Sequence, residues 1–136
     1  MRLEITRRAD LAVRALRLLE AAGGRVKASV LAAAVGSTPG FVPQVLGPLV
    51  KRGWVRSEPG PSGGYSLIAP LESLSVLDVV EAIDGPTDAG KCVVADRRCA
   101  SGPLCAMHVA WSRARAELTA SLASTMIAEL STTTAP

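Results

Sequence analysis

A stretch of seventeen residues, from Cys92 to His108, contains every cysteine and the only histidine of this 136-residue chain. Six residues separate Cys92 from Cys99, five separate Cys99 from Cys105, and two separate Cys105 from His108. Glycine and proline residues in and beside the stretch indicate a loop. Thiolates and an imidazole are the soft ligands that select iron–sulfur clusters, zinc or copper(I). A loop with these side chains can wrap around a metal.

Other roles for these cysteines fit less well. Buried core cysteines are usually scattered, and the charged residues Asp96, Arg97 and Arg98 do not belong in a core strand. A disulfide would leave an odd thiol. Structural zinc sites pair ligands two to four residues apart, and Cys92 and Cys99 are spaced more widely. The spacing favours a cluster and keeps zinc as the second candidate.

The charge of the chain is divided unevenly. Residues 1–56 carry ten Lys/Arg and three Asp/Glu, a balance of +7. Residues 57–136 carry five Lys/Arg and nine Asp/Glu, a balance of −4. A basic first half is typical of a nucleic-acid-binding face.

The first half predicts three helices. Residues 6–22 have an apolar stripe at three- and four-residue steps, formed by Ala9, Ala12, Val13, Leu16 and Leu19. A short helix over 27–35 ends at Gly36. A third helix is expected from a Thr38-Pro39 start to about Arg52. Two short helices joined by a glycine turn indicate a helix-turn-helix.

In that motif the second helix presents its first residues to the bases of the major groove. The residues so placed are Thr38, Phe41, Val42 and Gln44. Gln44 is the strongest candidate, since an amide pairs with adenine through two hydrogen bonds. Lys51 and Arg52 are expected at phosphates. Because prolines and glycines interrupt this helix, it is either kinked or begins later than Thr38.

Two strand-like runs follow, at 54–57 and 65–68, separated by the turn-rich sequence EPGPSGG. A hairpin after three helices indicates a winged helix. Such wings contact a further stretch of DNA, which makes Arg56, Ser62 and Gly63 candidate contacts.

The remaining segments complete the expected layout. A helix over 75–83, capped by Ser73 or Ser75, closes a DNA-binding domain of residues 1–85. The cysteine loop occupies 86–106. A long helix over about 104–130 has a narrow apolar seam, and we expect it to pair with its copy in a homodimer. Residues 131–136 form a polar tail. The fold class is mainly α with a small β-hairpin.

In this order, the segments resemble the bacterial winged-helix iron–sulfur transcription regulators that include IscR and NsrR. The strongest likenesses are GPSGGYSL at Gly60–Leu67, LSVLDVVEAIDG at Leu74–Gly85, and the three-cysteine loop before a long helix. The resemblance implies a homodimer with a 2Fe–2S or 4Fe–4S cluster on Cys92, Cys99 and Cys105.

The resemblance leaves two candidates for the fourth ligand. His108, three residues after Cys105, matches the IscR pattern. Asp10, on the first helix, matches the NsrR pattern, in which an aspartate reaches the partner subunit's cluster. We favour His108. The chain departs from the family at Pro59, where an arginine is usual, and at Pro43, where a glutamate is usual. These departures affect the target DNA sequence more than the fold.

The resulting expectation is a cytoplasmic DNA-binding regulator, most simply a repressor, whose binding to a palindromic operator responds to NO, redox state or iron status. A cluster-free thiol or zinc switch on the same loop is the alternative. No apolar leader or membrane-spanning run is present in the sequence. An enzyme is not expected, because His108 has no partner in a known triad order and no phosphate-binding glycine motif occurs.

Overall fold

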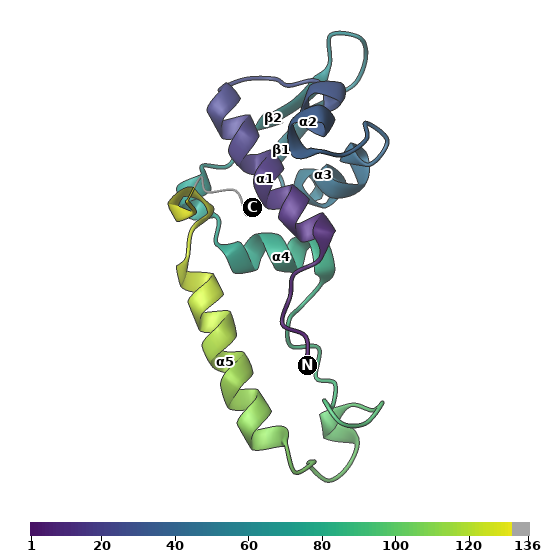
Figure 1. Ribbon diagram of the computed structural model, residues 1–136, viewed down its shortest axis with the longest axis vertical. Helices are drawn as coiled ribbons and strands as arrows, with labels where there is room; N and C mark the ends of the chain where they lie inside the picture. Colours follow the sequence, from purple (N-terminus) through teal and green to yellow (C-terminus); the bar gives the residue numbers. More distant parts are fainter. Residues whose placement is uncertain (132–136) are drawn as a thin grey trace.

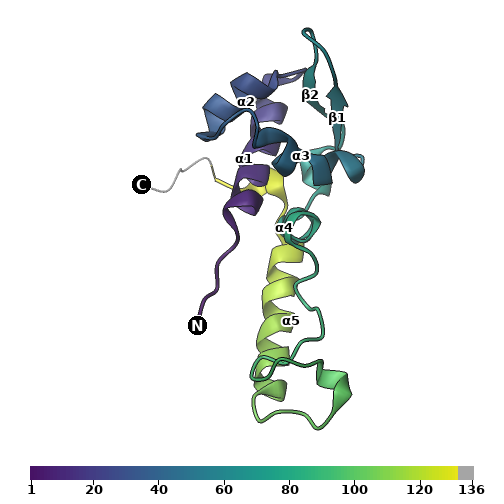
Figure 2. The same ribbon diagram turned by 90° about the vertical axis from the view of Figure 1, so that its right-hand side faces the viewer.

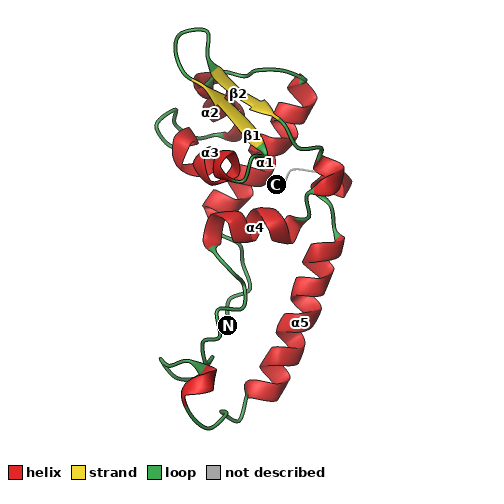
Figure 3. Ribbon diagram, turned by 180° about the vertical axis from the view of Figure 1, so that it is seen from behind, coloured by secondary structure: helices red, strands yellow, loops and turns green. Residues whose placement is uncertain are grey.

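The computed structural model describes residues 1–131 and consists of a compact body with a long arm (Figure 1). The body contains three helices, a two-stranded hairpin and a fourth helix. The arm contains the cysteine loop and a fifth helix, and Figure 2 shows both extending away from the body. The elements, shown by type in Figure 3, are α1 (Arg7–Ala22), α2 (Ala28–Val35), α3 (Val42–Lys51), β1 (Val55–Glu58), β2 (Gly64–Leu67), α4 (Val76–Asp84) and α5 (His108–Ser124), with short 3₁₀ turns η1 (Leu71–Ser73), η2 (Cys99–Ser101) and η3 (Ile127–Glu129). We call residues 1–84 together with η3 the body, and residues 86–124 the arm.

Helix α1 begins and ends at well-defined caps. The Thr6 hydroxyl accepts a hydrogen bond from the Ala9 amide at 3.1 Å, and Gly23 ends the helix in the left-handed conformation. Six side chains bury one face of α1, namely Ala9, Leu11, Ala12, Ala15, Leu16 and Leu19. The predicted helix and most of its stripe are thus confirmed, while Val13 is half-buried.

The helix-turn-helix differs from the prediction at the start of its second helix. Gly36 ends α2 at φ +70°, as expected. Thr38, however, caps no helix: residues 38–41 form a turn, and α3 begins at Val42. This later start puts Pro43 in the first turn, where a missing amide costs nothing, and leaves Pro48 inside the helix.

The hairpin forms a wing that is joined to the helix-turn-helix. Strands β1 and β2 pair antiparallel with Val55 opposite Leu67 and Glu58 opposite Gly64. Both lie one residue from the predicted runs, β1 later and β2 earlier. Val26, just before α2, exchanges two 2.8 Å backbone hydrogen bonds with Tyr65. The wing therefore keeps a fixed position relative to α2.

The last helix is shorter than predicted at both ends. It begins at His108 and ends at Ser124, whereas about 104–130 was expected. The chain leaves the helix because residues 125–127 pair with the segment before α4: Val76 donates to the Thr125 carbonyl and Ile127 to the Leu74 carbonyl, each at 2.8 Å. The arm thus returns to the body, where Ile127 is fully buried.

Helix α4 agrees with the prediction. Ser75 caps it, and the Ser75 hydroxyl and the Asp78 carboxylate form a reciprocal capping box. The tail predicted at 131–136 lies outside the described residues except for Ser131. Within residues 1–131 no helix is both long and apolar enough to cross a membrane.

Candidate functional site

The cysteine loop folds as a small irregular hairpin. Lys91 and Arg98 face each other across it. The Cys92 amide donates to the Arg97 carbonyl, and the Cys99 amide donates to the Gly90 carbonyl, each at 2.9 Å. These bonds hold Cys92 and Cys99 near the two ends of the hairpin.

The Arg97 side chain fastens this hairpin to the next part of the loop. Its guanidinium donates to the carbonyls of Arg98 and Pro103. The Cys105 carbonyl then accepts from the His108 amide at 3.1 Å, in the turn that leads into α5. A helix-like spacing of three residues therefore brings His108 next to Cys105.

The loop and the first turns of α5 share a small pocket of about 10 Å³. Cys99, Cys105 and His108 line it, together with Trp111 and Arg115. All three cysteines are half-buried. Three of the four predicted ligands therefore border one pocket, at the end of the arm furthest from the body.

Cys92 lies beside this group. Hydrogen bonds from the backbone amides of Val94 and Ala95 lower the pKa of the Cys92 thiol from its ordinary value. Partial burial opposes them, while the Cys105 thiol and the Arg97 charge add to the lowering. A thiolate is the form that binds metals and reacts as a nucleophile, so the loop favours the reactive form of Cys92.

The donor set of three thiols and an imidazole suits an iron–sulfur cluster or zinc. Among the described residues, no three Cys, His, Asp or Glu side chains lie close enough together to hold a single metal ion. Asp10 is on α1 in the body, where it pairs with Arg14 at 3.7 Å. In Figure 1, α1 lies in the body and the cysteine loop at the far end of the arm, with α4 between them, so a ligand role for Asp10 would require a second subunit.

The predicted DNA-contacting residues divide into exposed and buried ones. Thr38, Gln44 and Lys51 are exposed around α3. Val42 is only 5% exposed and packs in the core, so its predicted contact with bases is wrong. Phe41 is half-buried against the same core. The late start of α3 explains the error, because it turns Val42 toward α1.

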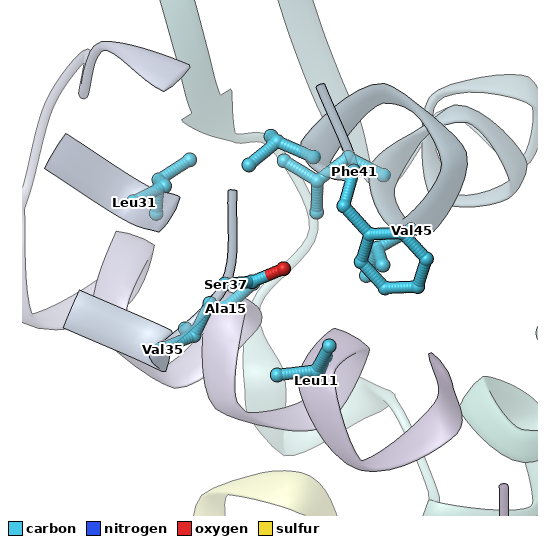
Figure 4. A pocket seen from close by; sticks show the side chains of 9 residues that line it. Leu11, Ala15, Leu31, Val35, Ser37, Phe41 and Val45 are labelled. Carbon is cyan, nitrogen blue, oxygen red and sulfur yellow. The ribbon is translucent and has the colours of Figure 1, made fainter. Parts of the chain in front are cut away.

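Phe41 and Val42 border a small cavity of about 10 Å³ between α1, α2 and α3 (Figure 4). Its other lining residues are aliphatic except Ser37, whose hydroxyl is its polar group. A space of this size holds at most about one water molecule. The cavity therefore belongs to the packing of the helix-turn-helix.

The basic residues after α3 lie as predicted on the surface. Arg52 is exposed, with its guanidinium 5.7 Å from the centre of the Trp54 ring, a cation–π arrangement. Arg56 is exposed on β1.

The tip of the wing has one exposed and one buried candidate. Ser62 is exposed. Gly63 is buried, and a Cβ there would lie 2.0 Å from the Glu58 carbonyl oxygen, so Gly63 shapes the turn and offers no surface to DNA. A groove of about 320 Å³ separates this tip from the start of α2.

Two arginines at the start of α1 contact the helix-turn-helix, which sequence reasoning missed. Arg7 donates to the Gly36 carbonyl at 3.3 Å, and Arg8 donates to the Gln44 carbonyl at 3.2 Å. The second contact joins residues 36 positions apart. Arg7 and Arg8 thus add two basic side chains next to the helix-turn-helix.

Comparison with known proteins agrees with this architecture. The family model Rrf2, described as an iron-dependent transcriptional regulator, matches residues 5–133. A Mycobacterium tuberculosis (strain H37Rv) protein, Rv1287, named as an HTH-type transcriptional regulator, is 35% identical over 130 residues, which cover 94% of this chain and 81% of that protein. The HTH-type transcriptional regulator IscR of Escherichia coli (strain HS) is 30% identical over 112 residues, which cover 82% of this chain and 68% of that protein.

Solved structures share the fold. T. potens IscR superimposes with a TM-score of 0.72 at 20% identity, covering 93% of this chain and 85% of that one. The oxidized form of Staphylococcus aureus CymR gives 0.71 at 21% identity, covering 98% and 100%. With a winged helix-turn-helix and a family model that spans nearly all of its length, the chain belongs to the Rrf2 family of DNA-binding transcriptional regulators.

Proposed function

We propose that this regulator is a homodimeric repressor whose binding to a palindromic operator is controlled by an iron–sulfur cluster. Cys92, Cys99 and Cys105 would hold the cluster, with His108 as the fourth ligand and the partner subunit's Asp10 as the alternative. The observation that carries the proposal is the shared pocket of Cys99, Cys105 and His108, with Cys92 beside it.

Two findings support iron over zinc. The matching family is described as iron-dependent. The gaps of six and five residues between the cysteines are also wider than those within the ligand pairs of structural zinc sites. A bound cluster would cross-link the three thiolates, and oxidants, NO or iron shortage could remove it.

The exposed helix α5 supports the dimer. None of its seventeen residues is buried, although Leu118 is large and apolar and 39% exposed. A helix without a buried face normally gains one from a partner. Pairing of two α5 helices would relate two recognition helices by a two-fold axis, as a palindromic operator requires. The division into residues 1–85, 86–106 and 104–130 is part of this proposal, with the helix itself beginning at His108.

Contacts at the base of the arm offer a route from loop to body. The Thr87 amide donates to the Glu81 carboxylate on α4 at 2.9 Å, and Arg115 on α5 pairs with Asp88 at 3.2 Å. At the end of α4, Asp84 accepts from the Thr6 hydroxyl that caps α1. A rearrangement of the loop would therefore act on α4 and α1, and through them on the spacing of the two recognition helices.

A thiol switch without a cluster is the second candidate. It is favoured by the lowered pKa of Cys92 and by the nearby Cys105 thiol, which together suit oxidation to a disulfide. The solved structure of CymR in an oxidized form makes a redox form of this fold a relevant precedent.

Spectroscopy of protein purified without oxygen tests the proposal. We expect a brown protein with thiolate-to-iron absorption and an electron-paramagnetic-resonance signal on reduction. The same spectra of His108→Ala and Asp10→Ala identify the fourth ligand, since only its loss should alter the signal. A colourless, folded protein that contains no iron would contradict the cluster and leave the thiol or zinc switch.

Binding to DNA is measured separately. A duplex selected by the protein from a random pool should be bound with an affinity that differs between the cluster-loaded, cluster-free and NO-treated forms. Equal affinities in all three forms would contradict sensing without affecting the DNA-binding assignment.

A further inference from the structure

Pro48 creates a problem inside the recognition helix. A proline has no amide hydrogen, so α3 lacks the donor that would ordinarily serve the carbonyl four residues earlier. That carbonyl belongs to Gln44, the exposed residue of α3 that is predicted to contact bases. An interior proline also pushes this carbonyl away from the helix axis and bends the helix.

Arg8 fills the place of the missing donor. Its guanidinium donates to the Gln44 carbonyl oxygen at 3.2 Å from the first turn of α1. A charged donor forms a stronger hydrogen bond than a neutral amide. The carbonyl left without its amide partner by Pro48 is thus the one that Arg8 serves.

The position of Arg8 is itself well fixed. Thr6 caps the first turn of α1 and donates to Asp84 at the end of α4. Ala9, next to Arg8, is fully buried. The guanidinium therefore reaches α3 from a turn that is anchored to the body on two sides.

We propose that Arg8 is a positioning residue for DNA recognition: it holds the Pro48-interrupted helix α3 in the conformation that presents Gln44 to the bases. This inference rests on the proposed role of Gln44 at the DNA. It also accounts for how a proline is tolerated in the middle of a recognition helix.

The proposal predicts that the effects of Arg8 and Pro48 depend on each other. Pro48→Ala restores an amide to residue 48, which can then donate to the Gln44 carbonyl and make Arg8 dispensable. Arg8→Ala should weaken binding to the selected duplex about fivefold in the natural chain, the effect of one charged hydrogen bond at the surface. In the Pro48→Ala background the same substitution should have little effect.

Arg7→Ala is the matched control. It removes the same charge one residue away, but Arg7 donates to the Gly36 carbonyl at the end of α2 and not to α3. Affinities of the full chain for the selected duplex are measured over a range of salt concentrations, because lost phosphate contacts reduce the salt dependence of binding.

Hydrogen exchange of the DNA-free protein gives a readout that does not depend on the role of Gln44. Arg8→Ala should speed exchange of the amides of residues 45–47 and 49–51 in the natural chain, whereas neither Arg7→Ala nor Arg8→Ala combined with Pro48→Ala should do so. Unchanged exchange in Arg8→Ala would refute the positioning role. An equal loss of affinity in both backgrounds, with a smaller salt dependence, would instead make Arg8 a direct phosphate contact and overturn the proposal. Faster exchange with unchanged DNA affinity would place the failure in the role of Gln44 and not in the contact from Arg8.

Discussion

The body and the arm of this regulator are stabilised in different ways. Among the described residues, every buried apolar side chain lies in the body, either between Ala9 and Ile83 or at Ile127. The arm contributes no buried apolar residue, and its loop is held by backbone hydrogen bonds and by ion pairs such as Arg115 with Asp88. The body therefore has its own hydrophobic core, whereas the arm depends on polar contacts and on whatever binds it.

This difference fits the separate tasks that we propose for the two regions. A part with its own core keeps its shape when a ligand leaves, and DNA recognition needs such a part. A part with few buried contacts opens at low energetic cost, which suits a segment that responds to a signal. The thiols of the chain all lie in this second region.

The largest expected effect tests where the arm ends. Ile127 follows α5 in sequence, yet it is fully buried in the core of the body. Ile127→Ala should lower the free energy of unfolding by about 2–5 kcal/mol, because it removes buried methyl groups and leaves a cavity. Chemical denaturation at a fixed protein concentration measures this loss.

Ile68→Ala provides the control, since Ile68 is 51% exposed at the end of the wing. Its effect should stay within about 0.5 kcal/mol. Equal effects of the two substitutions would show that residues 125–130 do not dock on the body, and the boundary between body and arm would have to move.

Sequence patterns predicted the body better than the arm for a physical reason. Apolar periodicity reports which side chains are buried by their own chain, and it located α1, α2 and α4 to within a residue or so. The apolar seam that predicted a helix over about 104–130 includes Met126 and Leu130. It could not show that the backbone leaves the helix at Thr125 to pair with residues 74–76. That pairing joins distant segments and leaves no local signal.

The recognition helix shows a second limit. Pro43 and Pro48 gave a clear sign of irregularity, and the later start of α3 was one of the two outcomes expected. Val42 lies in the core and not on the predicted DNA face, and this outcome depends on a shift of three residues in the helix start. The cysteines were easier to nominate as candidate ligands, because thiol chemistry is visible in the sequence without the geometry.

A smaller effect is expected from the outer face of the arm. If α5 pairs with its copy, Leu118→Glu would place a charge in an apolar contact, and burying an unpaired charge is costly. We expect the dissociation constant of the dimer to rise about tenfold or more, equivalent to at least about 1.4 kcal/mol. Sedimentation velocity over a range of concentrations measures it.

Ala116→Glu serves as the matched substitution. Ala116 is exposed on α5, two residues from Leu118 and therefore on nearly the opposite face of the helix. It should leave the dimer intact, and circular dichroism should show the same helix content for both variants. Dimers that survive Leu118→Glu unchanged would mean that another surface joins the subunits.

The smallest expected effect concerns the thiol chemistry of the arm. The pKa of Cys92 is lowered chiefly by hydrogen bonds from the backbone amides of Val94 and Ala95, so it depends on the folded hairpin. A lowered pKa means that the thiolate is populated at lower pH in the folded protein than in the unfolded chain. In metal-free protein, the pH midpoint for alkylation of Cys92 by iodoacetamide should therefore lie below the midpoint measured in urea, with mass spectrometry identifying the modified residue.

Arg97→Gln removes a minor cause of the lowered pKa. It should raise the pH midpoint of the folded protein slightly and leave the midpoint in urea unchanged. Identical midpoints in the folded and unfolded protein would show that the loop hairpin is not formed in the metal-free protein. The body would then be ordered by itself, whereas the arm would be ordered only when a ligand is bound.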